Sequence, residues 1–562
     1  MLRRACAVAM ALAAVPSAAS AQQVTAALLP DSVAERVVAF YNRETTTRMI
    51  GDARIGPATT VSGDVAVLTG TLVVEGVVEG DVVVINGSLD VRAGGSIRGR
   101  ATVVGGDVRG DPGPAIAGGV ETFREPLRYR FTDGRLAYVP AELERGLSAG
   151  LDLPFGRTDV LAAVHTSYNR VEGLPLAIGP RIRFGGRYPT TARALVIWRS
   201  AAASELDPRR LGYSIGADQL VAPNIGLSLG VRVFSEVVPI EEAGLSSRET
   251  GLSTLLLHRD YRDHYEREGW AVRARLQRPG TPYTFEIEYR DEEHESRDTA
   301  DPFTIFYDSE AWRPQPAVGE GPVRYAIAAL GYDSRNEDRD PSAGWLARVE
   351  LERGLGGRLA TPALGPAPPP GESAAFYRPE RTDFAAARVD VRGYARLSPY
   401  TRLALRLAAA GSIDGGSLPP QRQHALGGEG SLPGYRLFEF DCGARAMTID
   451  VRGSALHPGY GCDRMALVQL EYQANFPLAR GLAEAVGLGS AVGSLVRWVA
   501  FFDAGRAWNE ADARDGRPGG NDDFSADAGL GIRLGPLGAY WAVPLSGSGQ
   551  GFNFFVRLEP RI

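Results

Sequence analysis

The sequence predicts an all-β fold: a transmembrane antiparallel β-barrel of about 16 strands, with a small N-terminal periplasmic β-helix. Three observations predict it. Glycine makes up 68 of the 562 residues and proline 37, which favours turns and short strands over long helices. A glycine-punctuated repeat fills residues 55–119, and alternating strands follow residue 126. Beyond the N-terminus no apolar run approaches the ~18 residues of a spanning helix.

The N-terminus has the pattern of a secretory signal peptide. Arg3 and Arg4 precede a short apolar stretch, Ala5–Val15, and Ala19-Ser20-Ala21 forms a cleavage site. We therefore expect residues 1–21 to be a signal peptide and the mature protein to work in an oxidising compartment.

Two cysteines, Cys442 and Cys462, follow the predicted signal peptide. In a secreted chain they most simply form one disulfide, which would close a loop between positions 20 apart. A redox or metal-binding pair is the alternative, but neither a C-x-x-C motif nor a Cys/His cluster accompanies them.

Residues 22–54 are expected to form a helix and a linker. Within them, Asp31–Arg43 has apolar residues at helical spacing, and Ser32 with Glu35 forms a capping box.

Residues 55–119 contain a repeat with a period of about 18 residues, which suits a β-helix with three short strands per coil. One glycine series is Gly63, Gly80 and Gly99, and the other is Gly70, Gly87 and Gly106. Glycines turn the corners, and stacked coils bury the valines that lie between them. The segment resembles the bactofilin-like β-helices, which polymerise end to end. The alternative is a rigid periplasmic spacer that does not polymerise.

Residues 120–562 are expected to form the barrel. Leu403, Leu405 and Leu407 alternate with polar residues, and so do Val389 and Val391. Charged residues on the second face suit a barrel with a lipid-facing outside and a wet interior. Short turns, such as residues 398–400, and long polar loops, such as 364–380, suit the periplasmic and extracellular ends. A soluble multi-stranded β protein is the alternative.

Four motifs in this region resemble the bacterial surface antigen superfamily, which includes outer-membrane assembly factors and two-partner secretion translocators. They are Tyr168-Asn169-Arg170-Val171-Glu172-Gly173-Leu174 in an early strand; a hairpin motif with Asp333, Arg335, Pro341 and Gly344; a lumen-loop motif with Gly427, Gly428, Pro433, Gly434, Tyr435 and Arg436; and a barrel-wall motif with Phe501, Asp503 and Gly505. A terminal strand follows, in which Phe552, Phe554, Val556 and Leu558 alternate.

The resemblance implies that an inward-folded loop contacts the barrel wall. In the family an arginine of this loop reaches the wall motif, and the resemblance implies a contact with its aspartate, Asp503 here. In this sequence Pro433 stands at the arginine position and cannot donate a hydrogen bond from its side chain. Arg436 is the hypothetical substitute. A Cys442–Cys462 disulfide would staple the loop that follows Tyr435.

The resemblance therefore implies an outer-membrane translocator or assembly factor with a non-catalytic, loop-plugged pore, opening laterally between the first and last strands. Its partners would be outer-membrane lipid and periplasmic client proteins. Family helpers receive clients through POTRA domains with a βααββ pattern, which residues 22–126 do not show. The alternative is a structural or passive pore barrel, whose periplasmic β-helix tethers or organises partners or self-associates.

Few residues in the sequence are candidates for catalysis or metal binding. His165 with Ser167, and the stretch from His258 to Glu266, are the best candidates for a hydrolase or a metal site. Nothing in the sequence orients the first pair, and the two histidines of the second are far apart along a strand. We expect no enzyme activity, cofactor or metal, and the net charge of −6 indicates no nucleic acid partner.

Overall fold

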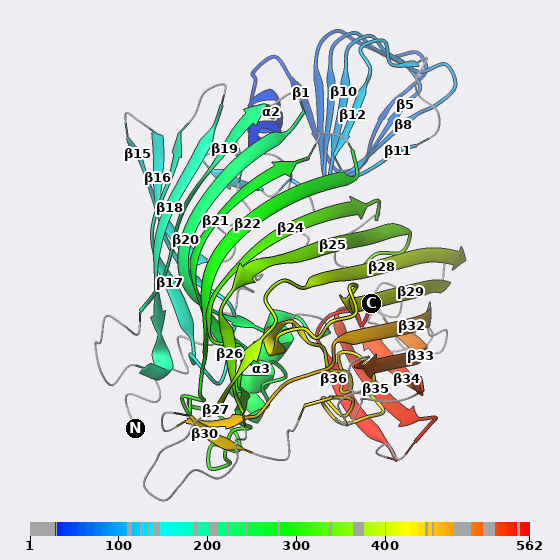
Figure 1. Cartoon of the computed structure of the whole chain (residues 1–562). Coiled ribbons are helices and arrows are strands. Elements are labelled where there is room, and N and C mark those ends of the chain that lie inside the picture. Colours follow the sequence, from blue (N-terminus) through cyan, green and yellow to red (C-terminus); the bar gives the residue numbers. More distant parts are fainter. Residues whose placement is uncertain are drawn as a thin grey trace, which may run out of the picture. The chain divides into compact units, whose positions relative to one another are not determined.

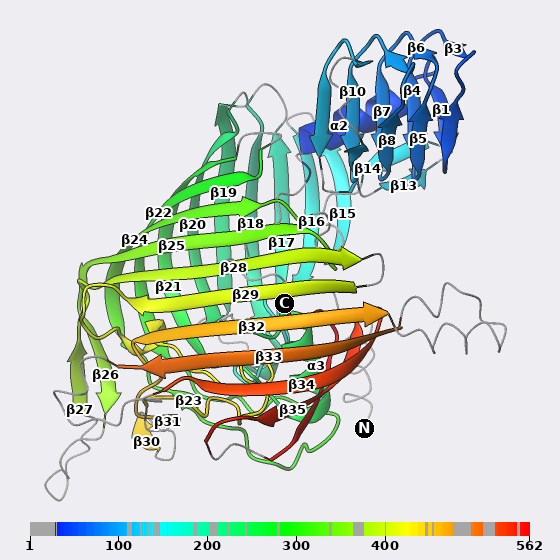
Figure 2. The ribbon, with the colours of Figure 1, turned by 90° about the vertical axis from the view of Figure 1, so that its right-hand side faces the viewer.

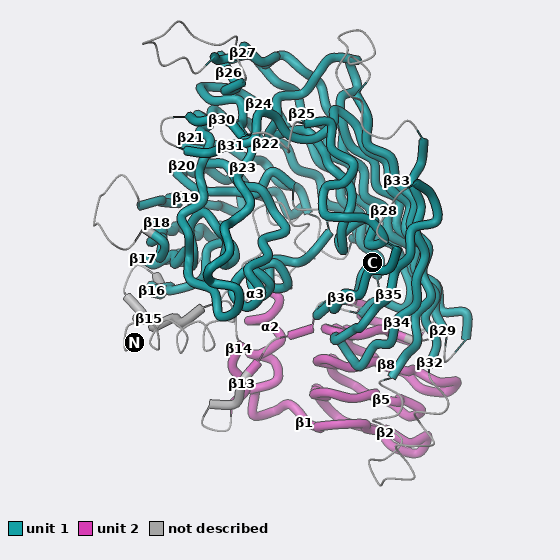
Figure 3. Tube along the Cα trace, turned by 90° about the horizontal axis from the view of Figure 1, so that it is seen from below, with its two compact units in different colours: residues 1–23, 146–335, 339–562 teal, residues 24–145, 336–338 magenta. Residues whose placement is uncertain are grey.

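The structure is a computed structural model, and it divides into two compact units (Figure 3). One comprises residues 24–145 with 336–338, and the other residues 1–23, 146–335 and 339–562. The described residues are 29 and 31–562, except 110–114, 124–125, 128, 133–134, 139–145, 154–155, 185–187, 203–210, 223–224, 242–243, 278–280, 336–339, 364–375, 399–400, 444–447, 452–453, 476–495, 510–522 and 548–550. The predicted signal peptide lies outside them.

The first unit contains a parallel β-solenoid. Its three sheets have the orders β1-β4-β7-β10-β12, β11-β8-β5-β2 and β3-β6-β9. The strands are β1 (Thr47–Ile50), β2 (Ala53–Ile55), β3 (Thr60–Val61), β4 (Val65–Leu68), β5 (Thr71–Val74), β6 (Val77–Val78), β7 (Val82–Ile85), β8 (Ser88–Val91), β9 (Ser96–Ile97), β10 (Ala101–Val104), β11 (Val108–Arg109) and β12 (Val120–Phe123). Val67, Val84 and Val103 align in register and are buried in its core.

Columns of glycine explain the repeat. A Cβ on Gly87 would lie 1.9 Å from the backbone oxygen of Gly70, and one on Gly106 would lie 1.9 Å from that of Gly87. Gly80 and Gly99 make the same kind of approach, at 2.4 Å, to the coil before each. The coils therefore stack at corners that leave no room for a side chain.

The five-stranded solenoid sheet is covered on its second face as well. Helix α2 (Asp31–Tyr41) and the hairpin β13 (Tyr129–Thr132) with β14 (Arg135–Tyr138) pack there, as Figure 2 shows for the helix. Val37 of α2 contacts the cluster that includes Leu68 and Ile85, which explains why β4 and β7 are buried at every position. Strand β12 and the hairpin, which we assigned to the barrel domain, belong to this unit.

The second unit is built on one 17-stranded sheet in which every neighbouring pair is antiparallel (Figures 1 and 2). In order its strands are β15 (Gly146–Leu153), β16 (Gly156–Val164), β17 (Pro175–Phe184), β18 (Thr190–Arg199), β19 (Gly212–Ala222), β20 (Leu227–Pro239), β21 (His264–Leu276), β22 (Tyr283–Ser296), β24 (Gly321–Asp333), β25 (Gly344–Gly357), β28 (Ala385–Ser398), β29 (Thr401–Ser412), β32 (Arg464–Asn475), β33 (Val496–Trp508), β34 (Ser525–Leu534), β35 (Leu537–Pro544) and β36 (Asn553–Arg557). The predicted all-β fold class is confirmed, with one strand more than the expected number of about 16.

Alternation separates the two faces of this sheet. In β22 the outward Phe285 and Ile287 are exposed, whereas Glu288, Arg290 and Glu292 are buried on the inner face. Water-excluded charges on one face and exposed large apolar residues on the other are the pattern of a membrane barrel wall. No helix in the described ranges is long and apolar enough to cross a membrane.

Connections at the two ends of the sheet differ in length, as the sequence predicts. Strands β34 and β35 are joined through residues 535–536, whereas β29 and β32 are joined through 413–463. Another long connection, 240–263, contains the unpredicted helix α3 (Ser247–Leu257). Ser246 caps α3 and Glu249 completes a capping box, a signal that was present in the sequence.

We predict that Gly87→Ala destabilises the solenoid, because its new Cβ would press on the Gly70 backbone. Overpacking of this kind costs about 1–3 kcal/mol. Limited proteolysis of the full-length protein, followed through fragments cut within residues 47–123, measures the loss. The matched control is Gly56→Ala, whose Cβ has Thr59 Oγ1 at 3.8 Å as its nearest neighbour. Equal cleavage rates for the two variants would contradict the prediction.

Candidate functional site

The long connection 413–463 folds against the inner face of the wall, and we call it the lumen loop. It contains a 3-10 turn (Pro420–Arg422), β30 (Ile449–Val451) and β31 (Ser454–His457). Leu426, Leu432 and Tyr435 are buried in one cluster with wall residues of β29, β32 and β33. Those wall residues are Ala408, Ala410, Met465, Leu467 and Ala507.

One end of the lumen loop is anchored by polar contacts to β21, β22 and β25. Gln421 Nε2 lies 2.9 Å from His294 Nδ1. The Arg422 guanidinium donates to Glu352 Oε1 at 2.7 Å and to the Tyr265 hydroxyl at 3.1 Å. Because these partners are withdrawn from water, the loop supplies the hydrogen bonds that their burial requires.

The lumen-loop motif forms a second anchor, on β34 to β36. The backbone N–H of Gly434 donates to Asp527 Oδ2 at 2.8 Å, and the Tyr435 hydroxyl donates to the carbonyl of Ala526 at 3.0 Å. A Cβ on Gly434 would lie 2.7 Å from the Asp527 Cβ, so only glycine permits this approach.

Gly427 and Gly428 have positive φ angles of 118° and 82° where the lumen-loop motif turns. Asn553 of β36 donates to the Pro433 carbonyl at 2.7 Å.

The barrel-wall motif lies beside this anchor on β33. Phe501, Asp503 and Gly505 share the inner face by alternation, and the structure brings this motif to the lumen loop. A Cβ on Gly505 would meet Leu426 Cδ1 at 3.0 Å and Leu432 Cδ1 at 3.3 Å. Gly505 therefore makes room for the loop.

The hypothetical pair between Arg436 and Asp503 is not formed. Arg436 is exposed and Asp503 is fully buried. Instead, the Arg561 guanidinium binds Asp503 and stacks 3.8 Å from the centre of the Phe501 ring. The hypothesis was wrong because the turn that places Gly434 against the wall leaves Arg436 exposed, and its nearness in sequence to the family position could not show this.

The hairpin motif lies at the β24–β25 connection, as expected. Arg335 donates to Asp333 at 2.7 Å, and Gly344 has a positive φ of 102°. Asp340, next to Pro341, is the main hub: it accepts from Arg402 of β29, from Arg497 of β33 at 2.8 Å and from Arg533 of β34 at 3.3 Å. The sequence motif did not single out Asp340.

The motif that begins at Tyr168 forms a turn between β16 and β17, and its assignment to a strand was wrong. Asn169 and Gly173 exchange backbone hydrogen bonds across the turn. Arg170 is fully buried and donates to Asp263 at 2.6 Å. The turn exists because these polar side chains find partners in the 240–263 connection rather than along a ladder.

A disulfide joins Cys442 to Cys462, as the sequence predicts, with 4.9 Å between the Cα atoms. Cys462 is buried and exchanges two backbone hydrogen bonds with His424, at 2.8 and 2.7 Å. The disulfide closes the part of the lumen loop that carries β30 and β31. The backbone hydrogen bonds of Cys462 with His424 link this part to the segment that carries Gln421 and Arg422.

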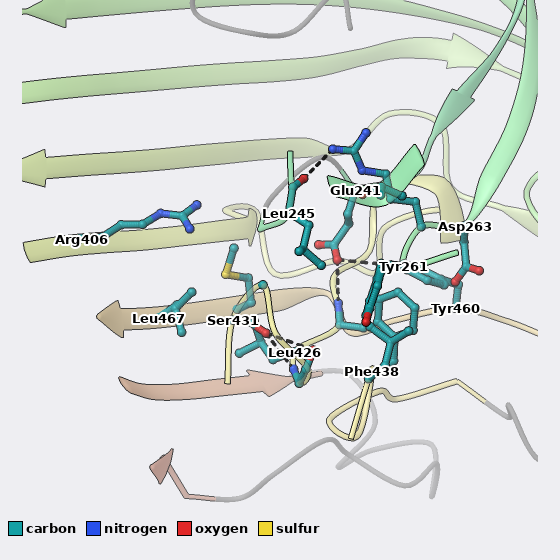
Figure 4. A pocket seen from close by; sticks show the side chains of 17 residues that line it. Glu241, Leu245, Tyr261, Asp263, Arg406, Leu426, Ser431, Phe438, Tyr460 and Leu467 are labelled. Carbon is teal, nitrogen blue, oxygen red and sulfur yellow. Dashed lines mark hydrogen bonds between the residues drawn. The ribbon is translucent and has the colours of Figure 1, made fainter. Parts of the chain in front are cut away.

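A cavity of about 50 Å³ lies between the lumen loop and the 240–263 connection (Figure 4). Its lining includes Glu241, which accepts from the Tyr460 hydroxyl at 3.2 Å, and Arg406 of β29. A space of this size holds a few water molecules and no substrate. Within the described ranges no group of three or more His, Cys, Asp or Glu side chains is arranged to hold a metal.

We predict that Asp340→Asn destabilises the barrel in a pH-dependent way. Burial raises the pKa of Asp340, but the hydrogen bond from Arg402 and the charges of Arg402 and Arg533 lower it to about 2. Because the unfolded pKa is about 3.9, the stabilisation is complete above that pH and disappears as the pH falls towards 2.

Urea unfolding of the detergent-solubilised protein at several pH values measures this loss. At pH 7 the variant should lose roughly 1–3 kcal/mol, and the difference from the wild type should vanish near pH 2. Asp383→Asn is the control, since that carboxylate is 70% exposed. A pH-independent difference would contradict the prediction.

The model of the Omp85 superfamily domain matches residues 203–556, more than half of the chain. Among solved structures, BamA from Haemophilus ducreyi lacking POTRA domains 1–3 has 15% identity and a TM-score of 0.42, covering 76% of this chain and 80% of that one. CdiB from Escherichia coli has 12% identity and a TM-score of 0.30 (77% and 67% covered), and CdiB from Acinetobacter baumannii 11% and 0.29 (76% and 69%).

No curated protein sequence matches this chain. The family match includes the lumen-loop, hairpin and barrel-wall motifs, and it agrees with the antiparallel sheet and the exposed apolar face. The chain therefore belongs to the Omp85 superfamily of outer-membrane β-barrel proteins.

Proposed function

We propose that this protein is a non-catalytic translocator or assembly factor of the outer membrane, whose pore is closed at rest by the lumen loop. The observation that carries the proposal is the two-sided anchoring of that loop across the interior. Gln421 and Arg422 hold one end on β21, β22 and β25, and Gly434 and Tyr435 hold the other on β34.

The inner wall is suited to a water-filled path. Arg267 pairs with Glu236 at 2.7 Å, Arg290 with Glu288 at 2.9 Å and Arg406 with Asp390 at 2.7 Å. Paired charges of this kind keep an interior polar without leaving unbalanced charge. Displacing the loop would expose such a surface to a passing chain or to ions.

The two anchors differ in how they are made, which suggests how the loop opens. Guanidinium and amide side chains form the first, and the backbone pair of His424 with the disulfide-bonded Cys462 lies next to it. The second relies on one backbone N–H, one hydroxyl, the amide of Asn553 and apolar packing, with no guanidinium of the loop. We infer that the second releases first and that the loop pivots about the first.

A structural or passive pore barrel is the second candidate function. The described residues of the first unit form a solenoid with α2 and a hairpin, instead of the βααββ arrangement through which family helpers receive client chains. In this candidate the solenoid tethers or organises periplasmic partners, or pairs with another copy. Sedimentation of the full-length protein at rising concentration tests self-association.

The decisive experiment is single-channel conductance of the purified protein in planar bilayers, with and without reductant. We predict that reduction increases the open fraction, because a disulfide that closes about 20 residues contributes roughly 3 kcal/mol in the chain-entropy model. The variant with both Cys442→Ser and Cys462→Ser should behave as the reduced protein and should no longer respond to reductant.

The other outcomes separate the candidates. Steady conductance that is insensitive to reductant would indicate a passive pore. The absence of conductance in all forms, from protein shown to be folded, would indicate a sealed structural barrel.

A further inference from the structure

The residues that follow β36 turn into the interior of the sheet. Arg561 and Ile562 are both buried, and Ile562 packs against Tyr394 of β28 and Ala404 of β29. We call residues 558–562 the inward segment. It crosses from β36, one edge of the sheet, to strands that lie well away from that edge in the strand order.

Arg561 is the main polar contact of the inward segment. Its guanidinium binds Asp503, lies 3.6 Å from Glu471 of β32 and stacks on Phe501. Arg561, Asp503 and Glu471 are all nearly inaccessible to water. A buried charge pair of this kind is strongly destabilised when one partner is lost, because the other charge is left uncompensated.

Asp503 is next to the carboxylate that holds the plug. Asp503 and Asp527 are direct cross-strand partners of β33 and β34, and both are fully buried. Asp527 accepts the N–H of Gly434 at 2.8 Å. Two buried carboxyl groups that face each other across a strand pair repel when both are ionised, and Arg561 is the counter-charge that faces Asp503. The charge state of Asp503 therefore acts on Asp527 and on its hydrogen bond with Gly434.

Strand β36 is tied to the interior at two further points. Asn553 donates to the Pro433 carbonyl at 2.7 Å, and Arg557 donates to Glu249 of α3 at 2.8 and 3.1 Å. The backbone N–H of Leu558 also donates to Glu249, at 2.7 Å. This edge strand pairs with β35 over only five residues, so these ties are a substantial part of what holds it.

We propose that Arg561 is a positioning residue for the plug: by neutralising Asp503 it keeps Asp527 in place to hold Gly434, and thereby couples β36 to the lumen loop. Arg561 supplies the positive charge that the loop motif lacks, because proline stands at the arginine position, 433. Release of β36 withdraws Arg561, leaves Asp503 facing Asp527 without a counter-charge, and frees the second anchor of the loop. This rests on the proposed function of the loop as the plug.

The test measures release of the loop directly and conductance separately. In a Leu432→Cys background, a thiol on the buried face of the loop reacts with a water-soluble maleimide only when the loop leaves the wall. Arg561→Gln should raise the labelling rate by about tenfold or more, the scale of losing a buried charge-assisted hydrogen bond. It should also raise the open fraction in bilayers.

Two further variants make the result specific. Adding Asp503→Asn to Arg561→Gln removes the carboxylate that faces Asp527, although Glu471 stays without its counter-charge. Labelling should then return towards that of the parent, which a merely structural role of Arg561 would not do. Arg436→Gln is the matched control, since that arginine is exposed, and should leave labelling unchanged.

Unchanged labelling in folded Arg561→Gln, or no recovery with Asp503→Asn, overturns the proposal. A wild-type protein that conducts steadily while Arg561→Gln still raises labelling contradicts the plug function, but leaves Arg561 as the residue that positions the loop. Protein folding is checked in each variant by heat-modifiable migration on gels and by circular dichroism.

Discussion

The pairing of charges on the inner face of the wall is the constraint on which the rest of the second unit depends. Alternation sends every second side chain of a strand inward, and many of these are arginine, glutamate or aspartate. Once loops cover them, each needs a partner, because an isolated buried charge is far more costly than a paired one. Several partners come from the loops themselves: Arg422 for Glu352, Glu249 for Arg557 and Arg561 for Asp503. The charges of the wall therefore hold the interior segments in place.

The structure also requires that backbone segments approach each other closely, and glycine makes this possible in both units. In the solenoid Gly70, Gly87 and Gly106 let one coil rest on the next. On the barrel wall Gly505 makes room for the leucines of the lumen loop, and Gly434 lets the loop backbone reach Asp527. The first set repeats at regular spacing and is visible in sequence. The second is visible only as part of a motif, since each glycine matters through one distant contact.

This difference explains how much of the structure could be predicted. Strict alternation, as in residues 403–407, predicts a strand because the signal is local, and the glycine repeat predicts the solenoid for the same reason. The contact of Arg561 with Asp503 joins positions 58 apart and has no local pattern. The motif at Tyr168 was misplaced for a related reason: Arg170 is satisfied by Asp263, 93 positions away, so its turn geometry cannot be read from neighbours. Helix α3 is different, because the capping box of Ser246 and Glu249 is a local sequence signal from which the helix could have been predicted.

The placement of Arg561 changes what the family motif requires. If an arginine of the loop bound the wall aspartate, the loop would be fastened by one of its own residues, and only movement of the loop could break the pair. With proline at position 433, the loop contributes a carbonyl and a neighbouring N–H, and the charge comes from beside β36. The lumen loop is then held by an element outside itself, one that lies at the edge of the sheet and pairs over only five residues. In the proposal, opening at that edge and displacement of the loop are two consequences of one broken ion pair, because coupling between two sites requires an element whose state both share.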